Sequence, residues 1–397
     1  GWRRGGLGAR GSERVALEAA HGRVLAETPC APTAYPFEAN SAMDGYALRA
    51  GTGPWRVIGE SAAGHPFAGQ LDAGEAVRIF TGAVVPTGAD SVLIQEEAQR
   101  QGEQLTTQVP PSKGQHIRAA GSDLCKGQEL LASGQQLDAA ALSALAGLGL
   151  THVACNHRPK LMLFATGDEL QRPGSERAPG QIFESNGLYL RLASELAGAE
   201  VLHVAQLPDQ RDAIDTALEQ AVNAADLVLL SGGVSVGDHD LVGRAIKDQA
   251  GGLTFYKVRM KPGKPVAAAR QGNCTLLGLP GNPASTVVSF ELFARPAILR
   301  LAGCKTPHRR LAFAPCVVPL AAGGKRCEFL RARLSDTGLA PHPRQGSGDL
   351  SSLLGVDALV MRPSDAAATQ AGQRVPYLAL HGPGSALAPE AQWATMG

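Results

Sequence analysis

The central part of the chain, residues 160–303, alternates between short apolar runs and longer amphipathic stretches. A continuous apolar run is typical of a strand buried on both faces, whereas apolar residues three or four positions apart indicate a helix. The runs that predict strands are Leu161–Ala165, Val201–Ala205, Leu227–Leu230, Thr254–Met260 and Thr275–Leu279. Strands and helices that alternate in this order predict a parallel sheet with crossover helices.

The helix between the first two strands has a recognisable start and face. Ser185 or Asn186 can cap it, because both side chains offer an oxygen to free backbone N–H groups. Leu188, Leu192 and Leu196 recur every four residues and form one apolar face.

Short strands separated by Gly and Pro lie on both sides of this region. Before it, the predicted strands are Trp55–Ile58, Ala76–Phe80, Ser91–Gln95 and Gln104–Val109. They indicate a small β-rich domain inserted between two helices, Glu13–His21 and Asp138–Leu148. After it, the strands predict a small β-barrel or sandwich, and they are Leu311–Leu320, Cys327–Leu334, Leu359–Met361 and Pro376–Leu380.

Composition narrows the class of protein. The 397 residues carry a net charge of +1, which argues against a nucleic-acid-binding protein held by a broad basic field. No apolar stretch approaches the roughly 20 residues of a membrane span. The seven cysteines form no C-x-x-C pair, so neither a disulfide framework nor a structural zinc site is indicated, and a reducing cytoplasm fits best.

Glycines and acidic residues follow the ends of two predicted strands. Ser231-Gly232-Gly233 ends one strand, with Asp238 and Asp240 next in the chain, and Thr166-Gly167-Asp168-Glu169 ends another. Ligands of open parallel sheets bind beyond the carboxyl ends of the strands. For any one of these turns, an ordinary turn with a capping Asp is the competing interpretation.

Cations and a helix start add two candidate anion sites. If Thr254–Met260 is a strand, Lys257, Arg259 and Lys261 point to one face, and Lys264 follows at a turn. A bound anion or an exposed basic edge strand explains this row equally well. Farther on, Pro280-Gly281-Asn282-Pro283 places a capping residue and then proline at the start of a helix. Its free N–H groups would attract an anion, although simple capping is the alternative.

Three polar residues of the first half and one later loop are weaker candidates. Asp44 lies in an Asp-Gly turn, Thr81 ends a strand, and Asp123 precedes the return to helix. Each alone has an ordinary explanation as a turn or surface residue. The loop 345–348, Gln-Gly-Ser-Gly, has ligand-like character.

Five ordered motifs resemble the MoeA family of molybdopterin molybdenumtransferases, to which the gephyrin E domain also belongs. They are Ser41-Ala42-Met43-Asp44-Gly45-Tyr46-Ala47, Thr166-Gly167-Asp168-Glu169-Leu170, residues 231–237, Lys261-Pro262-Gly263-Lys264-Pro265 and Gly278-Leu279-Pro280-Gly281-Asn282-Pro283. The resemblance spans about residues 13–380. There are two departures: the family's longer N-terminal helix before Glu13 is missing or replaced, and Ala39 stands where the family has Asp, with an acid at Glu38 instead.

The resemblance implies an α/β multidomain subunit in an elongated homodimer. Its parts would be a small α/β linking domain (12–28 and 124–155), a β-rich inserted domain (29–123), a MogA-like molybdopterin-binding α/β sheet domain (156–305) and a C-terminal β-barrel domain (306–385). The implied reaction inserts molybdenum from molybdate into adenylated molybdopterin, with Mg²⁺-dependent release of AMP. An adenylating MogA-type protein is the implied partner.

The resemblance also assigns roles to residues of this sequence. The implied catalytic residues are Asp240, Asp44, Glu169 and Lys261, and the implied Mg²⁺ ligands are Asp240 and Asp238. The implied substrate-binding residues are Thr81, Asp123, Asp168, Asp209, Ser231, Gly232, Gly233, Lys257, Lys264, Pro280, Pro283, Arg331 and Ser347. In the family, Asp44, Thr81 and Asp123 face the sheet domain of the other subunit.

Two other functions compete with this one. The chain could be a scaffold or binding protein, a role that the gephyrin E domain combines with receptor clustering. It could also be another pterin or nucleotide enzyme on the same sheet fold. Acids and lysines that share one cleft favour the transferase, because a pure scaffold needs neither.

Overall fold

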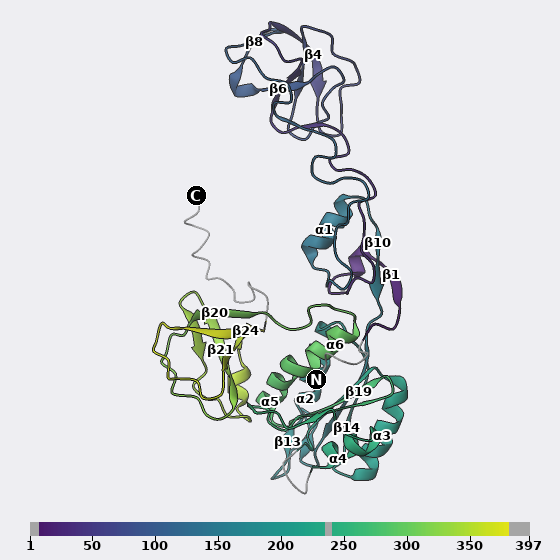
Figure 1. The fold of residues 1–397 in the computed structure, drawn as a ribbon, viewed down its shortest axis with the longest axis vertical. Coiled ribbons are helices and arrows are strands. Elements are labelled where there is room, and N and C mark those ends of the chain that lie inside the picture. Colours follow the sequence, from purple (N-terminus) through teal and green to yellow (C-terminus); the bar gives the residue numbers. More distant parts are fainter. Residues whose placement is uncertain (1–7, 235–239, 381–397) are drawn as a thin grey trace.

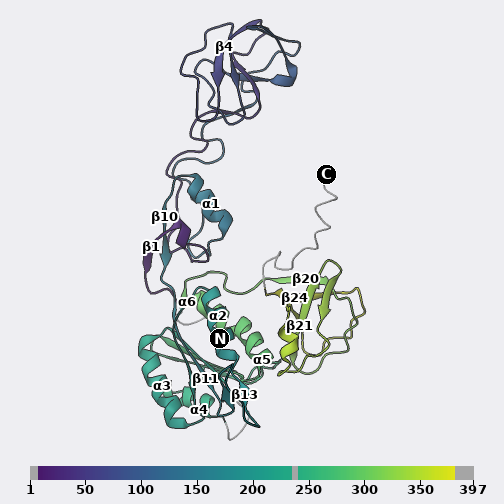
Figure 2. The same ribbon diagram turned by 180° about the vertical axis from the view of Figure 1, so that it is seen from behind.

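A computed structural model describes residues 8–234 and 240–380. The molecule is elongated, with a β-rich unit at one end and a helix-covered sheet at the other (Figure 1). A small unit that contains α1 lies between them. The C-terminal strands form a fourth unit beside the helix-covered sheet (Figure 2).

The large sheet has the strand order β14-β11-β15-β19-β18-β16. Its first four strands are parallel: β14 (Glu200–Leu207), β11 (Lys160–Thr166), β15 (Leu227–Ser231) and β19 (Cys274–Leu279). The prediction of a wholly parallel sheet is wrong at the other edge, where β18 (Ala267–Gln271) and β16 (Phe255–Tyr256) are antiparallel. Because Gln271 pairs with Cys274, a two-residue turn returns β18 directly into β19.

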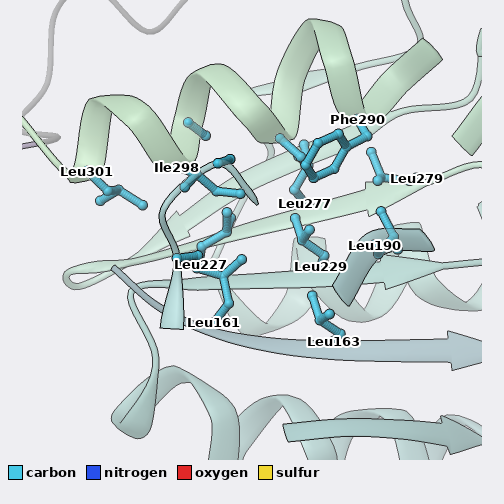
Figure 3. Close-up of a cluster of buried hydrophobic side chains, with 14 of the residues drawn as sticks. Leu161, Leu163, Leu190, Leu227, Leu229, Leu277, Leu279, Phe290, Ile298 and Leu301 are labelled. Atoms are coloured by element: carbon cyan, nitrogen blue, oxygen red, sulfur yellow. The ribbon is translucent and has the colours of Figure 1, made fainter. Parts of the chain in front are cut away.

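Helices cover both faces of this sheet. On one face, α2 (Asn186–Leu196), a π-helical turn (Phe290–Ala294) and α6 (Arg295–Leu301) pack on Leu161, Leu163, Leu227, Leu229 and Leu277 (Figure 3), and α5 (Pro283–Ser289) contacts β19. On the other, α3 (Arg211–Ala224) and α4 (Leu241–Gln249) pack on Val228, Leu230 and Leu276. Successive strand residues point to opposite faces, so the continuous apolar runs fill both layers.

Helix α2 buries a different face from the one the sequence predicted. Leu190 is fully buried in the sheet core, whereas Leu188, Leu192 and Leu196 are 53%, 45% and 86% exposed. The three leucines do share one side of the helix, but that side faces solvent. Such an exposed apolar stripe is the kind of surface that another protein covers.

The predicted strand Thr254–Met260 is broken in the middle. Its first part is β16 in the large sheet, and its end is β17 (Met260–Lys261), which pairs with β21 in the C-terminal sheet. Lys257 has a φ of +59°, a left-handed conformation that interrupts an extended strand. The predicted row of Lys257, Arg259 and Lys261 on one strand face is therefore wrong.

The C-terminal strands close into a small barrel-like sheet, as predicted. Four hydrogen-bonded neighbours follow β17 in the order β21 (Cys327–Ser335), β23 (Ala358–Arg362), β24 (Arg374–Ala379) and β20 (Leu311–Pro315), while β22 (Gly338–Pro341) pairs with β21. A bridge between Cys316 and Leu339 joins the end of β20 to β22, which completes the ring. A 3₁₀ turn, Leu350–Leu353, precedes β23.

The small middle unit corrects one helix prediction. Residues Ser12–Ala16 form β1, which pairs with β10 (His152–Asn156), and only Leu17–Ala19 form a 3₁₀ turn. Val15 and Leu17 are buried there, and the pairing with β10 prevails over the weak helical pattern of Glu13–His21. The predicted helix at Asp138 is confirmed as α1 (Ala139–Gly147), with the Asp138 carboxylate accepting from Ala141 N.

The β-rich unit contains the predicted short strands in one sheet of order β6-β3-β5-β4-β8-β7. These strands are β3 (Gly45–Leu48), β4 (Trp55–Ser61), β5 (Glu75–Ile79), β6 (Ser91–Ile94), β7 (Ala98–Gln101) and β8 (Gln104–Thr107). Beside them, β2 (Asn40–Ser41) pairs with β9 (Ile117–Arg118), and Gln95–Glu97 form a 3₁₀ turn. A separate small pair, β12 (Leu170–Gln171) and β13 (Ile182–Phe183), follows β11 in the large sheet's unit.

Candidate functional site

The carboxyl ends of three parallel strands meet at one edge of the large sheet. Ala165 of β11 lies beside Ser231 of β15, and Ser231 lies beside Leu279 of β19. The loops that begin at Thr166, Gly232 and Pro280 therefore leave the sheet next to one another. This is the convergence that the sequence predicted for the Thr166–Glu169 and Ser231–Gly233 motifs.

Two of these loops approach so closely that only glycine fits at Gly232. Its φ is +97°, and a Cβ atom there would lie 2.2 Å from the carbonyl oxygen of Thr166. Gly233 also has a positive φ, and a Cβ atom would lie 2.6 Å from Val242 of α4. The glycine pair thus brings the backbone after β15 against both β11 and α4.

Three carboxylates gather beyond β11 and β14. The Asp168 carboxylate accepts a hydrogen bond from the backbone N of Asp209 at 3.0 Å, and Glu169 follows in the same loop. Partial burial, together with the charges of Asp168 and Glu169, raises the pKa of Asp209. A cavity of about 750 Å³ opens beside this group, and Asp168, Glu184 and His203 are among its lining residues.

Asp240 lies at the start of α4, where it is buried. One carboxylate oxygen accepts from Gly243 N at 3.0 Å, and the other accepts from the Tyr256 hydroxyl. Burial and this carboxylate raise the pKa of Tyr256 to about 12. The Lys257 ammonium lies 4.4 Å from the centre of the Tyr256 ring. Asp238, the second expected Mg²⁺ ligand, falls outside the described residues.

Strand register brings two of the predicted lysines to the same edge. Ala267 of β18 lies beside Gly278 near the carboxyl end of β19, and Tyr256 lies beside Ala267. Lys257, which follows Tyr256, is thereby held at this edge, with its backbone N donating to the carbonyl of Val266 at 3.0 Å. Lys264 is exposed in the same turn, and its carbonyl accepts from both Val258 N and Val266 N.

Lys261 lies where the sheet unit meets the C-terminal unit. Its ammonium is 3.2 Å from the carboxylate of Glu328 on β21. Nearby, Gly263 has a φ of +92° and packs against the last residue of α5, since a Cβ atom would lie 2.6 Å from Ser289 Oγ. The Lys261–Pro265 loop is therefore held between β21 and α5.

The helix start after Pro280 contacts the C-terminal loop 345–348. Pro283 is the first residue of α5, as predicted, and Asn282 is its N-cap residue. The Asn282 side chain makes no capping bond within the described structure; instead its Nδ2 donates to Ser347 Oγ at 3.1 Å. The backbone N of Ala284 donates to the Ser347 carbonyl at 3.0 Å, so Ser347 fastens one unit to the other.

Arg331 of β21 is fully buried and contacts the same loop 345–348. Its Nε donates to Ser352 Oγ at 3.0 Å and its Nη2 to the Gly346 carbonyl at 2.8 Å. Burial lowers the pKa of this guanidinium. Among the described residues, Nη1 has no hydrogen-bond partner, and the charge of Asp349 only partly offsets the effect of burial. A buried cation in this state is a natural partner for an anionic ligand.

Sequence reasoning missed Asn186 as a site residue and treated it only as a helix cap. Its Nδ2 donates to Ser231 Oγ at 2.9 Å and to the Gly281 carbonyl at 2.7 Å. The one signal that could have indicated a site residue was its position, because Asn186 is the first residue of a helix that follows a strand-end loop. Nothing in the local sequence indicated which loops it would join.

Asp44, Thr81 and Asp123 lie away from these loops in the same chain. The Asp44 carboxylate accepts from the backbone N and hydroxyl of Thr81 at 2.7 and 2.8 Å. These two hydrogen bonds, aided by the charge of Arg78, lower the pKa of Asp44. Asp123 is exposed near the connection to the middle unit, and its N donates to Tyr35 O. The β-rich unit and the large sheet occupy opposite ends of the molecule (Figures 1 and 2).

The described chain offers no ready-made metal cage. Among residues 8–234 and 240–380, no three His, Cys, Asp or Glu side chains are grouped to bind a metal ion. A second cavity of about 760 Å³ lies between α2, α5–α6 and residues 353–357, and the acids named above do not line it. Within the part that the structure describes, no helix is long and apolar enough to cross a membrane.

Comparisons with known proteins agree along most of the chain. Residues 6–149 match the family described as "MoeA N-terminal region (domain I and II)", residues 163–300 match "Probable molybdopterin binding domain", and residues 314–380 match "MoeA C-terminal region (domain IV)".

Individual proteins give the same result. A relative from Haemophilus influenzae named molybdopterin molybdenumtransferase is 38% identical over 299 residues, covering 74% of each chain. One of the same name from Staphylococcus aureus (strain MRSA252) is 30% identical over 374 residues, covering 91% of this chain and 89% of its own. A crystal structure of the molybdopterin biosynthesis MoeA protein from Pyrococcus horikoshii OT3 has a TM-score of 0.81 and 28% identity, covering 94% and 95% of the two chains.

The fold and these matches define a multidomain α/β protein built around a molybdopterin-binding type of sheet. More narrowly, the chain belongs to the MoeA family of molybdopterin molybdenumtransferases. The resemblance first indicated by the five sequence motifs is thereby confirmed.

Proposed function

We propose that this protein inserts molybdenum from molybdate into adenylated molybdopterin and releases AMP. The observation that carries this proposal is the meeting of three strand-end loops with the C-terminal loop 345–348, beside exposed lysines and the buried Arg331. Both substrates are anions, and Lys257, Lys261, Lys264 and Arg331 lie around these loops. The names of the relatives support a transfer of molybdenum to molybdopterin, and the meeting of these loops supports this edge of the sheet as its location.

The anion-binding groups divide naturally between the two substrates. Lys261, Arg331 and Ser347, at the junction of the two units, would hold molybdate. The loops Ser231–Gly233 and 280–283, with Lys257 and Lys264, would hold the pterin and its phosphates. Backbone N–H groups and ammonium groups suit phosphate oxygens because they provide positive charge without requiring one fixed orientation.

The acids Asp168, Glu169 and Asp209 suit the hydrolysis step. Mg²⁺ keeps several waters and binds through one or two carboxylates plus substrate phosphates, so a pre-formed protein cage is not required. Asp168 and Glu169 would hold such a hydrated ion, whose charge offsets the charge of the phosphoanhydride as AMP leaves. The resemblance implies Asp240 as a catalytic residue and, with Asp238, as a Mg²⁺ ligand. Because both oxygens of Asp240 are engaged by Gly243 and Tyr256, we propose instead that Asp240 positions Tyr256 and Lys257 at the site.

We propose further that the working form is a homodimer with four domains per subunit, divided as the sequence predicts. The exposed leucines of α2 supply an apolar surface for a second copy. Asp44, Thr81 and Asp123, which lie far from the sheet of their own chain, would complete the site of the partner subunit. A MogA-type protein would supply the adenylated substrate, and the seven free thiols, all within the described ranges, suit a reducing cytoplasm.

The test is a purified reaction with adenylated molybdopterin, molybdate and Mg²⁺. We expect AMP release in step with the formation of active cofactor, and a loss of both when a chelator removes Mg²⁺. Tungstate and sulfate serve as competing anions. Absence of AMP release by the folded wild-type protein would refute the transferase proposal and leave the scaffold function as the better account.

A further inference from the structure

The side chain of Asn186 lies where the loops of the candidate site are joined. It is the first residue of α2, and its Nδ2 donates to Ser231 Oγ at 2.9 Å and to the Gly281 carbonyl at 2.7 Å. Ser231 Oγ in turn donates to the Pro280 carbonyl at 3.4 Å. One amide nitrogen therefore ties the end of β15 to the end of β19.

The partners fix the orientation of this amide. A carbonyl oxygen only accepts hydrogen bonds, so the atom facing Gly281 O must be the NH₂ nitrogen. Its second hydrogen then serves Ser231 Oγ, whose own hydrogen remains for Pro280. If the amide were flipped, its oxygen would face the Gly281 carbonyl, and no hydrogen bond could form there.

The same connection reaches the C-terminal unit. Asn282, next to Gly281, donates to Ser347 Oγ at 3.1 Å, and Ala284 N donates to the Ser347 carbonyl at 3.0 Å. A displacement of Gly281 would therefore be passed to Ser347. By contrast, the neighbouring Ser185 is exposed, and its side chain makes no capping bond in the described structure.

We propose that Asn186 is a positioning residue for the reaction. It holds the Ser231–Gly233 loop and the 280–283 loop at the separation at which both reach one anionic substrate. This inference rests on the proposed transferase function and adds a residue to it. Removal of the amide would leave Ser231 Oγ and Gly281 O without their donor and allow the two loops to separate.

The kinetic test compares Asn186→Ala with Ser185→Ala, its neighbour at the same helix start. A misplacement of about 1 Å can cost roughly 100-fold in rate, so kcat/KM for AMP release should fall about 100-fold in Asn186→Ala. Ser185→Ala should match wild type. Asn186→Ala activity within about threefold of Ser185→Ala would overturn the proposal.

A second variant separates positioning from general destabilisation. Asn186→Asp keeps the shape but, when ionised, places an oxygen against Gly281 O. Once protonated, the carboxyl regains one donor, and its half-buried position between two acceptors favours that neutral form. Its activity relative to wild type should therefore rise as pH falls from about 7 toward about 5, where a carboxyl begins to protonate, whereas Asn186→Ala stays low throughout. Parallel pH profiles for the two variants would contradict the hydrogen-bond role.

Hydrogen–deuterium exchange provides a readout that does not depend on the reaction. Amides of residues 281–286 should exchange faster in Asn186→Ala than in Ser185→Ala, because their anchor is lost. If exchange rises in Asn186→Ala but the wild-type protein releases no AMP, Asn186 does hold the two loops together, and the transferase function is refuted. Unchanged exchange in Asn186→Ala would refute the role of Asn186 in holding the two loops, whatever the activity of the wild type.

Discussion

Gly232→Ala is expected to reduce kcat/KM for AMP release by at least about 100-fold. A Cβ atom at this position would lie 2.2 Å from the Thr166 carbonyl oxygen, and the φ of +97° also disfavours any side chain. The loop after β15 would have to move by about 1 Å away from β11, which takes it away from the phosphates that we propose it binds. The purified variant would be assayed with adenylated molybdopterin, molybdate and Mg²⁺.

Gly251→Ala is the matched control for this substitution. Gly251 also has a positive φ, +67°, but no atom lies within 4 Å of a Cβ built there. Alanine at position 251 therefore has the conformational penalty of a positive φ, about 1–2 kcal/mol, but its Cβ atom collides with nothing. Thermal unfolding of both variants would show whether each remains folded. If Gly232→Ala is folded and as active as Gly251→Ala, the strand-end loop is not part of the site.

The second large effect is the recovery of activity on mixing two inactive variants. Asp44→Ala and Lys261→Ala should each lose activity, because each removes one side of a site that we propose to span two subunits. Co-refolding equal amounts of them should restore about a quarter of the wild-type rate, since half of the dimers are mixed and each mixed dimer has one intact site. Lys261 is exposed, so its loss should cost at most about 1 kcal/mol of stability.

The control for this experiment pairs two variants on the same side of the site. Asp44→Ala mixed with Thr81→Ala leaves one defect in the same half of every site, so no activity should return. Recovery in that pair would point to a mixing artefact. Failure of the Asp44→Ala and Lys261→Ala pair, with dimers shown to exchange, would place Asp44 and Lys261 in the same subunit's site.

Much of the large sheet could be predicted from sequence because its strands are buried on both faces. Leu161–Ala165 and Leu227–Leu230 are apolar at every position, and that pattern needs no knowledge of neighbours. The convergence of the Thr166 and Gly232 loops followed from the same reasoning, since parallel strands end at one edge. The small barrel and the β-rich unit were predictable from their short strands and turns.

The failures occur where tertiary contacts decide the local structure. Thr254–Met260 has a strand pattern, but its first part pairs in the large sheet and its end pairs in the C-terminal sheet. The strand breaks between them at Lys257. Ser12–Ala16 became a strand because β10 lies beside it. Leu188 and Leu196 have the spacing of a buried face, although the sheet takes Leu190 instead. Asn186 acts on loops far away in sequence, so no local pattern could reveal its partners.

The most direct test of where the chemistry occurs is a crystal structure with adenylated molybdopterin and molybdate bound. The account predicts phosphate density between the Ser231–Gly233 and 280–283 loops, with molybdate beside Lys261, Arg331 and Ser347. Ligand seated instead in the cavity lined by Tyr189, Arg295 and Asp357, with these loops empty, would contradict it.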